Sequence, residues 1–455
     1  MLEKSAQLPE ALDAYQQALA RDHSSPFLYV RLGATQVKLG RPEQALKSFQ
    51  RALELEPSQP DALRWLAMLY ASQGNTDEAI RAYRRLAVQQ PTDRFVLSTL
   101  ADLYVLQGQL GDATTVYEQL IREFGSSYQL HFNLGILNGR LGRMSLAIQE
   151  LSRALELAPE SSEARVALGL MYEMNHQMDR AIALYEDAMR LDPLNPRLYH
   201  HAARAYSAEG KEAEAIHSYQ AVLDLAPADL DAIIGLVRIW MAKKQFQTAQ
   251  EFLGSKLQGL GNAPELYLVL GLVYQEAKAP QEAIRAFQRA IDGSESFPQA
   301  HFYLGAQLER LHREEEAKAE LHRCLELDPN YADALNYLGY MNAEQGISLH
   351  EAKSLIERAL AIDPDNGAYV DSLGWVYYQL GELEEAVRQL ERAVTLVDTD
   401  ATIFDHLGDA YVKQGQIEKA EQAWQHALQL DQSLGEVKRK LDTLRQHGAD
   451  STESR

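Results

Sequence analysis

The stretch RPEQALKSFQRALELEP, residues 41–57, decides the fold class. Its apolar residues are Ala45, Leu46, Phe49, Ala52, Leu53 and Leu55, with lysine, arginine and glutamate between them. Apolar residues that recur every three or four positions fall on one face of a helix. Proline lacks an amide hydrogen and disfavours helix in the residue before it, so Pro57 ends the segment. The stretch therefore predicts an amphipathic helix.

One alanine of this helix recurs along the whole chain. It stands at Ala11, Ala45, Ala79, Ala113, Ala147, Ala181, Ala215, Ala249, Ala283, Ala317, Ala352, Ala386 and Ala420. Every interval is 34 residues except the interval of 35 between Ala317 and Ala352. A fixed period of this length indicates an array of one small structural unit.

Other small positions recur in the same register. Twelve residues before the alanine, or thirteen before Ala352, stands a glycine or alanine such as Gly33, a series that only Val237 breaks. In many repeats another small residue, such as Ala52, stands seven residues after the alanine. Two antiparallel helices interlock closely only where a small side chain on one admits a large one from the other. Each unit is therefore predicted to be a pair of packed antiparallel helices.

The spacing Leu-Gly-x-x-Tyr, followed by alanine, an aromatic residue, alanine and proline, resembles the tetratricopeptide repeat (TPR) family over nearly the entire chain. The resemblance implies an all-α fold, a right-handed α-solenoid of tandem helix-turn-helix repeats. It also implies that the first helices line an inner groove, whereas the second helices face outward. Such grooves bind extended peptides or partner helices.

We predict five segments: an N-terminal half repeat in 1–25, repeats one to seven in 26–262, repeats eight to twelve in 263–431, a capping helix in 432–447 and a disordered tail in 448–455. The helix expected at residues 8–22 has no first helix before it. Either it is an N-terminal cap, or the reading frame extends upstream of Met1 and encodes a further helix.

Repeat seven departs from the pattern. Its small positions read Val237, Ala249 and Lys256, and GSKLQGLGNAP (254–264) contains three glycines and a proline. Burying Lys256 without a partner would be costly, so we expect the second helix to end early. We also expect a hinge near 254–262.

Composition excludes several classes of function. The formal net charge of −21 is the wrong sign for binding nucleic acid or an anionic membrane. No apolar run is long enough to insert into a membrane, and the single cysteine, Cys324, stands at a small packing position. The histidines form no recognisable metal motif, and no nucleophile stands beside a base. We predict no enzymatic activity, no cofactor and no metal site.

In the TPR family, positions 2, 5, 9 and 12 of each first helix face inward. In repeats four and five they include Phe132, Ile136, Val166 and Leu170, and in repeats eight and nine Leu268, Leu272, Phe302 and Ala306. Between these apolar stretches lie Arg197, His200, Arg204 and Arg238, which could bind an acidic segment. Alternatively, the arginines pair with neighbouring glutamates. The carboxylate clamp of chaperone-linked TPR domains does not appear, so we do not predict binding to chaperone tails.

The last three repeats carry a second candidate site for a partner. The inward positions there are Asn336, Tyr340, Asp371, Trp375, Tyr378, Asp405 and Asp409. Exposed aromatic residues beside carboxylates anchor peptides well, and residues 330–431 hold 18 acidic and 6 basic residues. A basic or amphipathic partner segment is expected. Alternatively, Trp375 packs against the neighbouring repeats and the carboxylates are only solvated.

Two stretches, DALNYLGYMNAEQGISLHEA (333–352) and DSLGWVYYQLGELEEA (371–386), resemble the C-terminal repeats of bacterial envelope TPR lipoproteins, some of which are adaptors for periplasmic proteases. The chain as written is expected to be soluble and cytoplasmic, or periplasmic and associated with the outer membrane if an upstream lipoprotein signal is missing. We expect a non-enzymatic scaffold or adaptor that binds protein or peptide partners in the inner groove, for complex assembly or for the delivery of substrates to a protease. The alternative is a non-catalytic subunit of a multi-subunit enzyme such as a glycosyltransferase.

Overall fold

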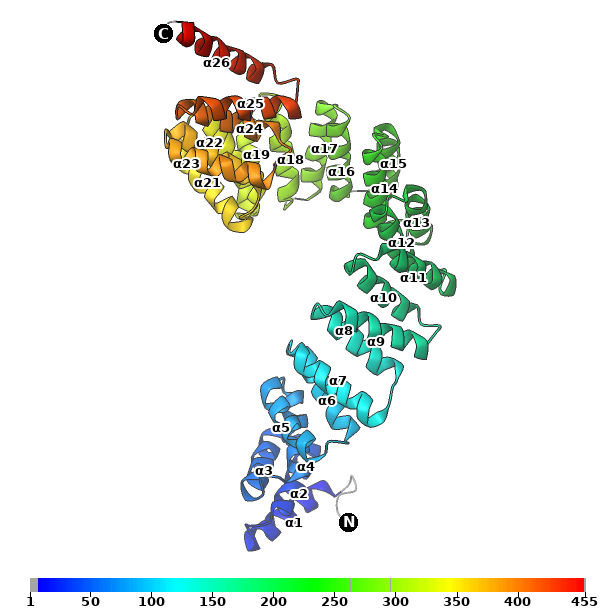
Figure 1. Cartoon of the computed structure of the whole chain (residues 1–455). Helices are drawn as coiled ribbons and strands as arrows, with labels where there is room; N and C mark the ends of the chain where they lie inside the picture. Colours follow the sequence, from blue (N-terminus) through cyan, green and yellow to red (C-terminus); the bar gives the residue numbers. More distant parts are fainter. Residues whose placement is uncertain (1–6, 262, 295, 454–455) are drawn as a thin grey trace. The chain divides into compact units, whose positions relative to one another are not determined.

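Tandem helices make up the chain (Figure 1). The computed structural model describes residues 7–261, 263–294 and 296–453, and these ranges contain helices and turns but no strand. The first thirteen helices are α1 (Leu8–Arg21), α2 (Pro26–Lys38), α3 (Pro42–Leu55), α4 (Pro60–Ser72), α5 (Thr76–Gln89), α6 (Arg94–Leu106), α7 (Leu110–Phe124), α8 (Tyr128–Arg140), α9 (Met144–Leu157), α10 (Ser162–Met174), α11 (Met178–Leu191), α12 (Pro196–Ala208) and α13 (Glu212–Leu225).

The remaining helices are α14 (Leu230–Ala242), α15 (Phe246–Leu260), α16 (Pro264–Glu276), α17 (Pro280–Gly293), α18 (Pro298–Glu309), α19 (Glu314–Leu327), α20 (Ala332–Glu344), α21 (Leu349–Ile362), α22 (Gly367–Leu380), α23 (Leu383–Leu396), α24 (Ala401–Lys413), α25 (Ile417–Leu430) and α26 (Gly435–Glu453). The all-α solenoid of helix-turn-helix repeats predicted from the sequence is confirmed. The helices group into two compact units, Met1–Ala232 and Ile233–Arg455, so the division falls within α14, upstream of the hinge expected near 254–262.

The recurrent small residues lie where the two helices of a repeat cross. A Cβ atom added to Gly33 would fall 2.6 Å from the ring of Phe49, and one added to Gly271 would fall 2.3 Å from the ring of Phe287. The packing role predicted for these residues is confirmed. The large partner stands four residues after the recurrent alanine, as Phe49 does after Ala45.

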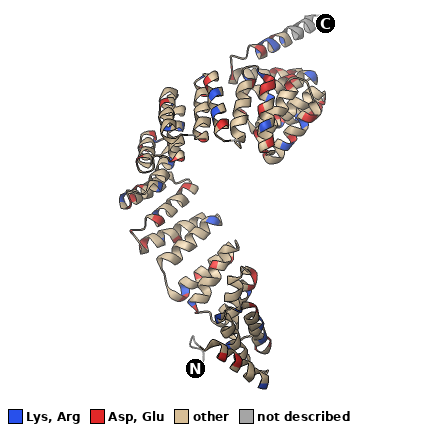
Figure 2. Ribbon diagram, turned by 180° about the vertical axis from the view of Figure 1, so that it is seen from behind, with Lys and Arg blue, Asp and Glu red and all other residues tan. Residues whose placement is uncertain are grey.

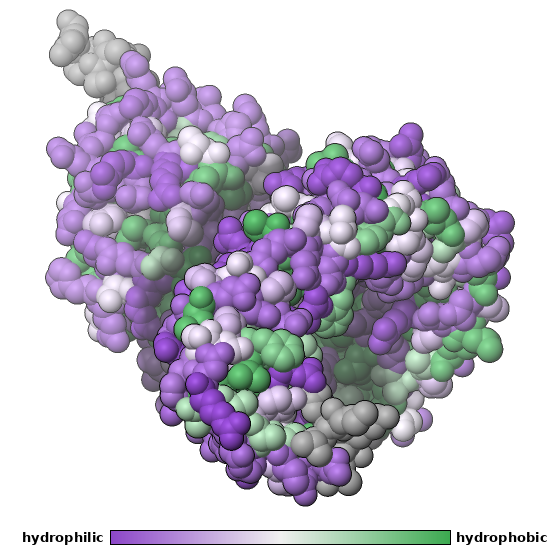
Figure 3. Space-filling model, turned by 90° about the horizontal axis from the view of Figure 1, so that it is seen from below, coloured by the Kyte–Doolittle hydropathy of each residue, from purple (hydrophilic) through white to green (hydrophobic). Residues whose placement is uncertain are grey.

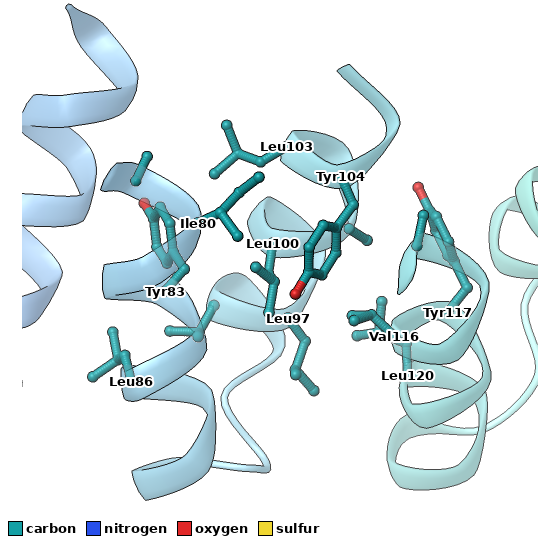
Figure 4. Packing of buried hydrophobic residues seen from close by; sticks show 14 of the residues in the cluster. Ile80, Tyr83, Leu86, Leu97, Leu100, Leu103, Tyr104, Val116, Tyr117 and Leu120 are labelled. Atoms are coloured by element: carbon teal, nitrogen blue, oxygen red, sulfur yellow. The ribbon is translucent and has the colours of Figure 1, made fainter. Parts of the chain in front are cut away.

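The cores of neighbouring repeats are continuous. In Figure 4, Tyr83 of α5 and Tyr117 of α7 lie on either side of Leu97 and Leu100 from α6, in one cluster of buried residues that runs from Leu63 to Leu137. Within this cluster each repeat therefore buries its apolar face against the next one, as expected for a solenoid. On the face shown in Figure 3, apolar side chains (green) form patches among hydrophilic ones.

Replacing two glycines of the second unit by alanine should change the free energy of unfolding in opposite directions. Gly271→Ala is expected to lower the free energy of unfolding by about 1–3 kcal/mol, because the new methyl group overlaps Phe287. Gly254→Ala, in the interior of α15 with no atom within 4 Å of the new Cβ, should raise it by about 0.5–1 kcal/mol. Urea denaturation of both variants checks this, and equal effects would contradict the packing argument.

The single interval of 35 residues arises in one turn. Most turns between the two helices of a repeat contain a residue with positive φ, as at Gly40 and Gly74, and His176 takes the same conformation at the equivalent position. In the turn before α21, both Gly346 and Ser348 have positive φ. The extra residue is thus absorbed between α20 and α21, so the helix pair itself keeps its register.

The second helix of repeat seven does not end early, so that prediction was wrong. The helix α15 continues through Gly254 and Lys256 to Leu260. Lys256 is only half-buried, and its Nζ lies 5.6 Å from the centre of the Phe252 ring. Its aliphatic stem can cover apolar surface while the ammonium group reaches toward the aromatic ring and water. The expected cost of burial therefore does not arise.

We still expect α15 to be the least stable helix. Gly254 and Gly259 lie within it, and each glycine favours the unfolded chain by roughly 0.5–1 kcal/mol relative to alanine. Hydrogen exchange should find the fastest helical amides in residues 249–262, of which residue 262 lies outside the described part. Uniform protection from repeat five to repeat nine would contradict this expectation.

Helices outside the twelve repeats flank the array. At one end, α1 packs on α2 and buries Ala11 and Leu19. At the other, α26 packs Val437 and Leu441 against Trp424 of α25. The helix α26 continues past residue 447 into the segment predicted as a tail, and residues 1–6 and 454–455 lie outside the described ranges.

Candidate partner-binding site

The first helices of the last three repeats carry the predicted aromatic and acidic residues. The helix α22 contacts both α20 and α24. Tyr340, Trp375 and Tyr378 are half-buried, whereas Tyr377 is almost fully buried in the core, as its packing position predicted. The three half-buried rings are therefore available on one side of the inner helices.

Trp375 is the centre of an aromatic cluster. Its ring stacks on Tyr378, with centroids 4.6 Å apart, and on His406 of α24, with centroids 4.2 Å apart. Tyr340 of α20 lies 6.2 Å from the His406 ring. These contacts join three repeats and hold the indole in one orientation. The packing of Trp375 against repeat twelve, which the sequence left as an alternative, is thus present in the structure.

His406 forms a buried ion pair beneath this cluster. Its Nδ1 lies 3.0 Å from each carboxylate oxygen of Asp371, and both residues are almost fully buried. Burial alone lowers the pKa of a histidine, but the charge and hydrogen bond of Asp371 outweigh it, so the pKa of His406 is raised. Asp371, predicted to face the groove, therefore holds His406 instead of meeting solvent.

A second basic group binds the other two predicted carboxylates. Nζ of Lys440, from α26, donates to Asp405 at 2.8 Å and to Asp409 at 2.7 Å. Burial lowers the pKa of Lys440, but these two carboxylates outweigh it and the pKa is raised. Figure 2 marks acidic residues in red and basic ones in blue along these helices. The capping helix thus neutralises part of the acidic face.

Polar atoms without a partner remain on the same inner helices. Nε1 of Trp375 and Oδ1 of Asn336 are buried, and neither forms a hydrogen bond within the described residues. A buried polar group left unpaired costs about 1–3 kcal/mol. Nε1 is a hydrogen-bond donor and Oδ1 is an acceptor.

The sequence reasoning missed His406 and Lys440. A signal was present, because each stands 35 residues after its acidic partner, one repeat plus one residue: Asp371 with His406, and Asp405 with Lys440. A basic residue that stands 35 positions after an inward-facing acidic residue lies on the next inner helix along the chain. From there its side chain can reach the acidic residue. His406 and Lys440 stand one position beyond the inward series, which is why that series does not include them.

The predicted basic patch divides between the two units. Arg197, His200 and Arg204 lie on α12, and Arg238 lies on α14 within the second unit. His200 packs edge-on against Tyr219 of α13. Among the described residues, neither Arg197 nor Arg204 takes part in an ion pair, so the pairing with neighbouring glutamates is not formed by these two arginines.

Other groups that could carry chemistry have packing roles or lie apart. Cys324 is fully buried, and burial raises the pKa of its thiol to about 12. Within the described ranges, no three metal-ligating side chains come together, and no helix has the length and apolar character needed to cross a membrane.

These helix pairs, interlocked at small residues and stacked in a fixed register, define a tandem-repeat solenoid. Tetratricopeptide repeat models match residues 30–94, 98–162, 139–196, 206–258, 308–367 and 401–434, and a TPR repeat model matches 374–415. The chain belongs to the tetratricopeptide repeat family. Proteins of this family generally mediate protein–protein interactions and act as scaffolds.

Curated relatives match only part of the chain. TPR repeat-containing protein PA4667 of Pseudomonas aeruginosa is 30% identical over 127 residues, which cover 27% of this chain and 22% of that protein. The peroxisomal targeting signal receptor of Kluyveromyces lactis is 25% identical over 47% of this chain and 38% of its own length. The chain thus matches less than half the length of either relative.

A solved structure shares the fold along most of the chain. The structure of Naa15/Naa10 bound to HypK-THB aligns with 92% of this chain and 65% of the other, with a TM-score of 0.50 and 18% identity. At that identity the likeness concerns the fold alone.

Proposed function

We propose that this protein is a non-enzymatic scaffold or adaptor that binds a segment of a partner protein along its inner helices, with the last three repeats as its main site. The observation that carries the proposal is Trp375. Its ring is half-buried and held by Tyr378 and His406, while its Nε1 has no acceptor within the described ranges. A rigid aromatic side chain with an unmet donor loses little entropy when it binds.

The charge around Trp375 indicates the chemistry of the partner. Residues 330–431 carry 18 acidic and 6 basic residues. Two lysines of this chain already contact the carboxylates and rings of the site. Lys440 binds Asp405 and Asp409, and Nζ of Lys413 lies 3.7 Å from the centre of the Tyr378 ring. Ammonium groups therefore suit both its carboxylates and its rings. The partner segment is accordingly basic or amphipathic.

Complex assembly or delivery of substrates to a protease is the process that we propose for this binding. The support is the likeness of residues 333–352 and 371–386 to envelope adaptors, together with a relative that is a targeting signal receptor. In the alternative, the chain is the non-catalytic subunit of an enzyme such as a glycosyltransferase.

Affinity purification tests the proposal. The tagged full chain and its Trp375→Ala/Tyr378→Ala variant are used side by side, and mass spectrometry identifies the proteins recovered with each. Partners recovered with the native chain and lost with the variant would support the site. Stoichiometric recovery of a catalytic subunit would favour the alternative, and identical recovery with both chains would contradict the site.

A further inference from the structure

A second groove lies in the first unit, along the inner side of α8, α10 and α12. It contains a pocket of about 330 Å³. The pocket is lined by Phe132 and Ile136 of α8, Val166 and Leu170 of α10, and Arg197 and His201 of α12. The four apolar side chains are only half-buried. Repeats four and five thus leave the apolar floor of this groove partly exposed.

One wall of this groove is basic. Arg197 and Arg204 are exposed, and neither forms an ion pair in the part of the chain that the structure describes. The lining also contains Glu163 of α10, whose carboxylate accepts a hydrogen bond from Tyr128 at 3.2 Å. Unpaired arginines are unexpected in a chain with a net charge of −21, where carboxylates are abundant.

His201 adds a neutral polar group to the same wall. Its ring stacks on Tyr185, with centroids 5.5 Å apart, and its Nδ1 is buried without a hydrogen bond within the described residues. Burial lowers the pKa of His201, so the ring is neutral at neutral pH. A neutral imidazole can pair with a peptide group as donor or acceptor.

We propose that this groove binds an acidic segment of a partner protein, which inserts an aliphatic side chain between α8 and α10 and directs carboxylates to Arg197 and Arg204. These arginines are seven residues apart on α12, which is about 10 Å along a helix. An extended chain covers that distance in about three residues. This surface goes beyond the site around Trp375, because it lies in the other unit and selects the opposite charge.

Short peptides of random sequence test this docking surface. An array of peptides, acetylated and amidated at their ends, is probed with the full-length labelled chain. We expect the retained peptides to combine Leu, Ile or Val with Asp or Glu within about three residues. For the best of them, fluorescence anisotropy should show that Arg197→Glu/Arg204→Glu weakens binding on the order of tenfold or more.

Matched variants separate this groove from general charge effects. Arg143→Glu reverses one positive charge, half of the change in the double variant, at an exposed residue outside the pocket lining, and it should leave the affinity unchanged. Arg197→Lys should retain part of the binding, because the charge is kept. No enrichment of acidic peptides, or equal affinity for the native chain and the double variant, would overturn the proposal. A second array of the same peptides with free C-terminal carboxylates is the further control, and binding by that array alone would overturn the proposal as well.

Discussion

Replacing Trp375 and Tyr378 together by alanine is expected to weaken partner binding by about 2 kcal/mol or more, because buried aromatic anchors dominate interfaces of this kind. Trp375 contacts Tyr378 and His406 through its ring, and in the part of the chain that the structure describes its Nε1 has no acceptor. A partner segment would cover the part of the ring that is still exposed. Titration calorimetry with a partner recovered by affinity purification measures the loss.

Because Trp375 stacks on His406 of repeat twelve, its replacement could disturb the fold, so the double variant needs a folding control. Circular dichroism and urea denaturation should show that the double variant keeps its helices. Trp375→Phe keeps the stacked ring but lacks the indole N–H, so its affinity should lie between those of the native chain and the double variant. An unchanged affinity in a folded double variant would refute the site.

Asp371→Ala is expected to destabilise the second unit by about 3–5 kcal/mol, because it removes one partner of a buried ion pair. His406 would remain enclosed by Trp375 and Tyr340 without a hydrogen-bonded counter-ion. Chemical denaturation measures the effect. A loss well below 1 kcal/mol would show that the pair is not formed in solution.

The same pair predicts how stability depends on pH. The pKa of His406 is raised, so the folded state holds a proton that the unfolded state releases above about pH 6.5. This contribution is fully present below about pH 6.5 and is lost as the pH rises through the folded pKa. Besides Asp371, the carboxylates of Asp405 and Glu344 favour the charged ring.

Substitutions at this pair should change how the stability depends on pH. In Asp371→Asn the favourable charge is gone and burial dominates, so His406 should become easier to deprotonate and its contribution to stability should rise with pH. In His406→Gln the contribution of this residue should disappear. Nuclear magnetic resonance of the His406 ring gives its pKa directly. A value below about 6.5 in the native chain would contradict the assignment.

The candidate site was predictable in part. Tyr340, Trp375 and Tyr378 could be placed on the inner side because the helical period turns their positions that way, and all three are half-buried in the structure. The state of the carboxylates was not predictable in the same way. Asp405 and Asp409 were expected to meet a partner's basic group, whereas Lys440 of the same chain binds both.

Period and side-chain size alone determined the family, the α-solenoid and the small residues that interlock, such as Gly33 against Phe49. These features follow from local geometry, since one helix pair with a fixed spacing repeats along the chain. Only the tertiary structure decided that α15 continues through Lys256, that His406 pairs with Asp371 and that Arg197 has no ionic partner among the described residues. Such contacts depend on how far side chains reach between neighbouring helices, and the spacing within one helix does not encode that distance.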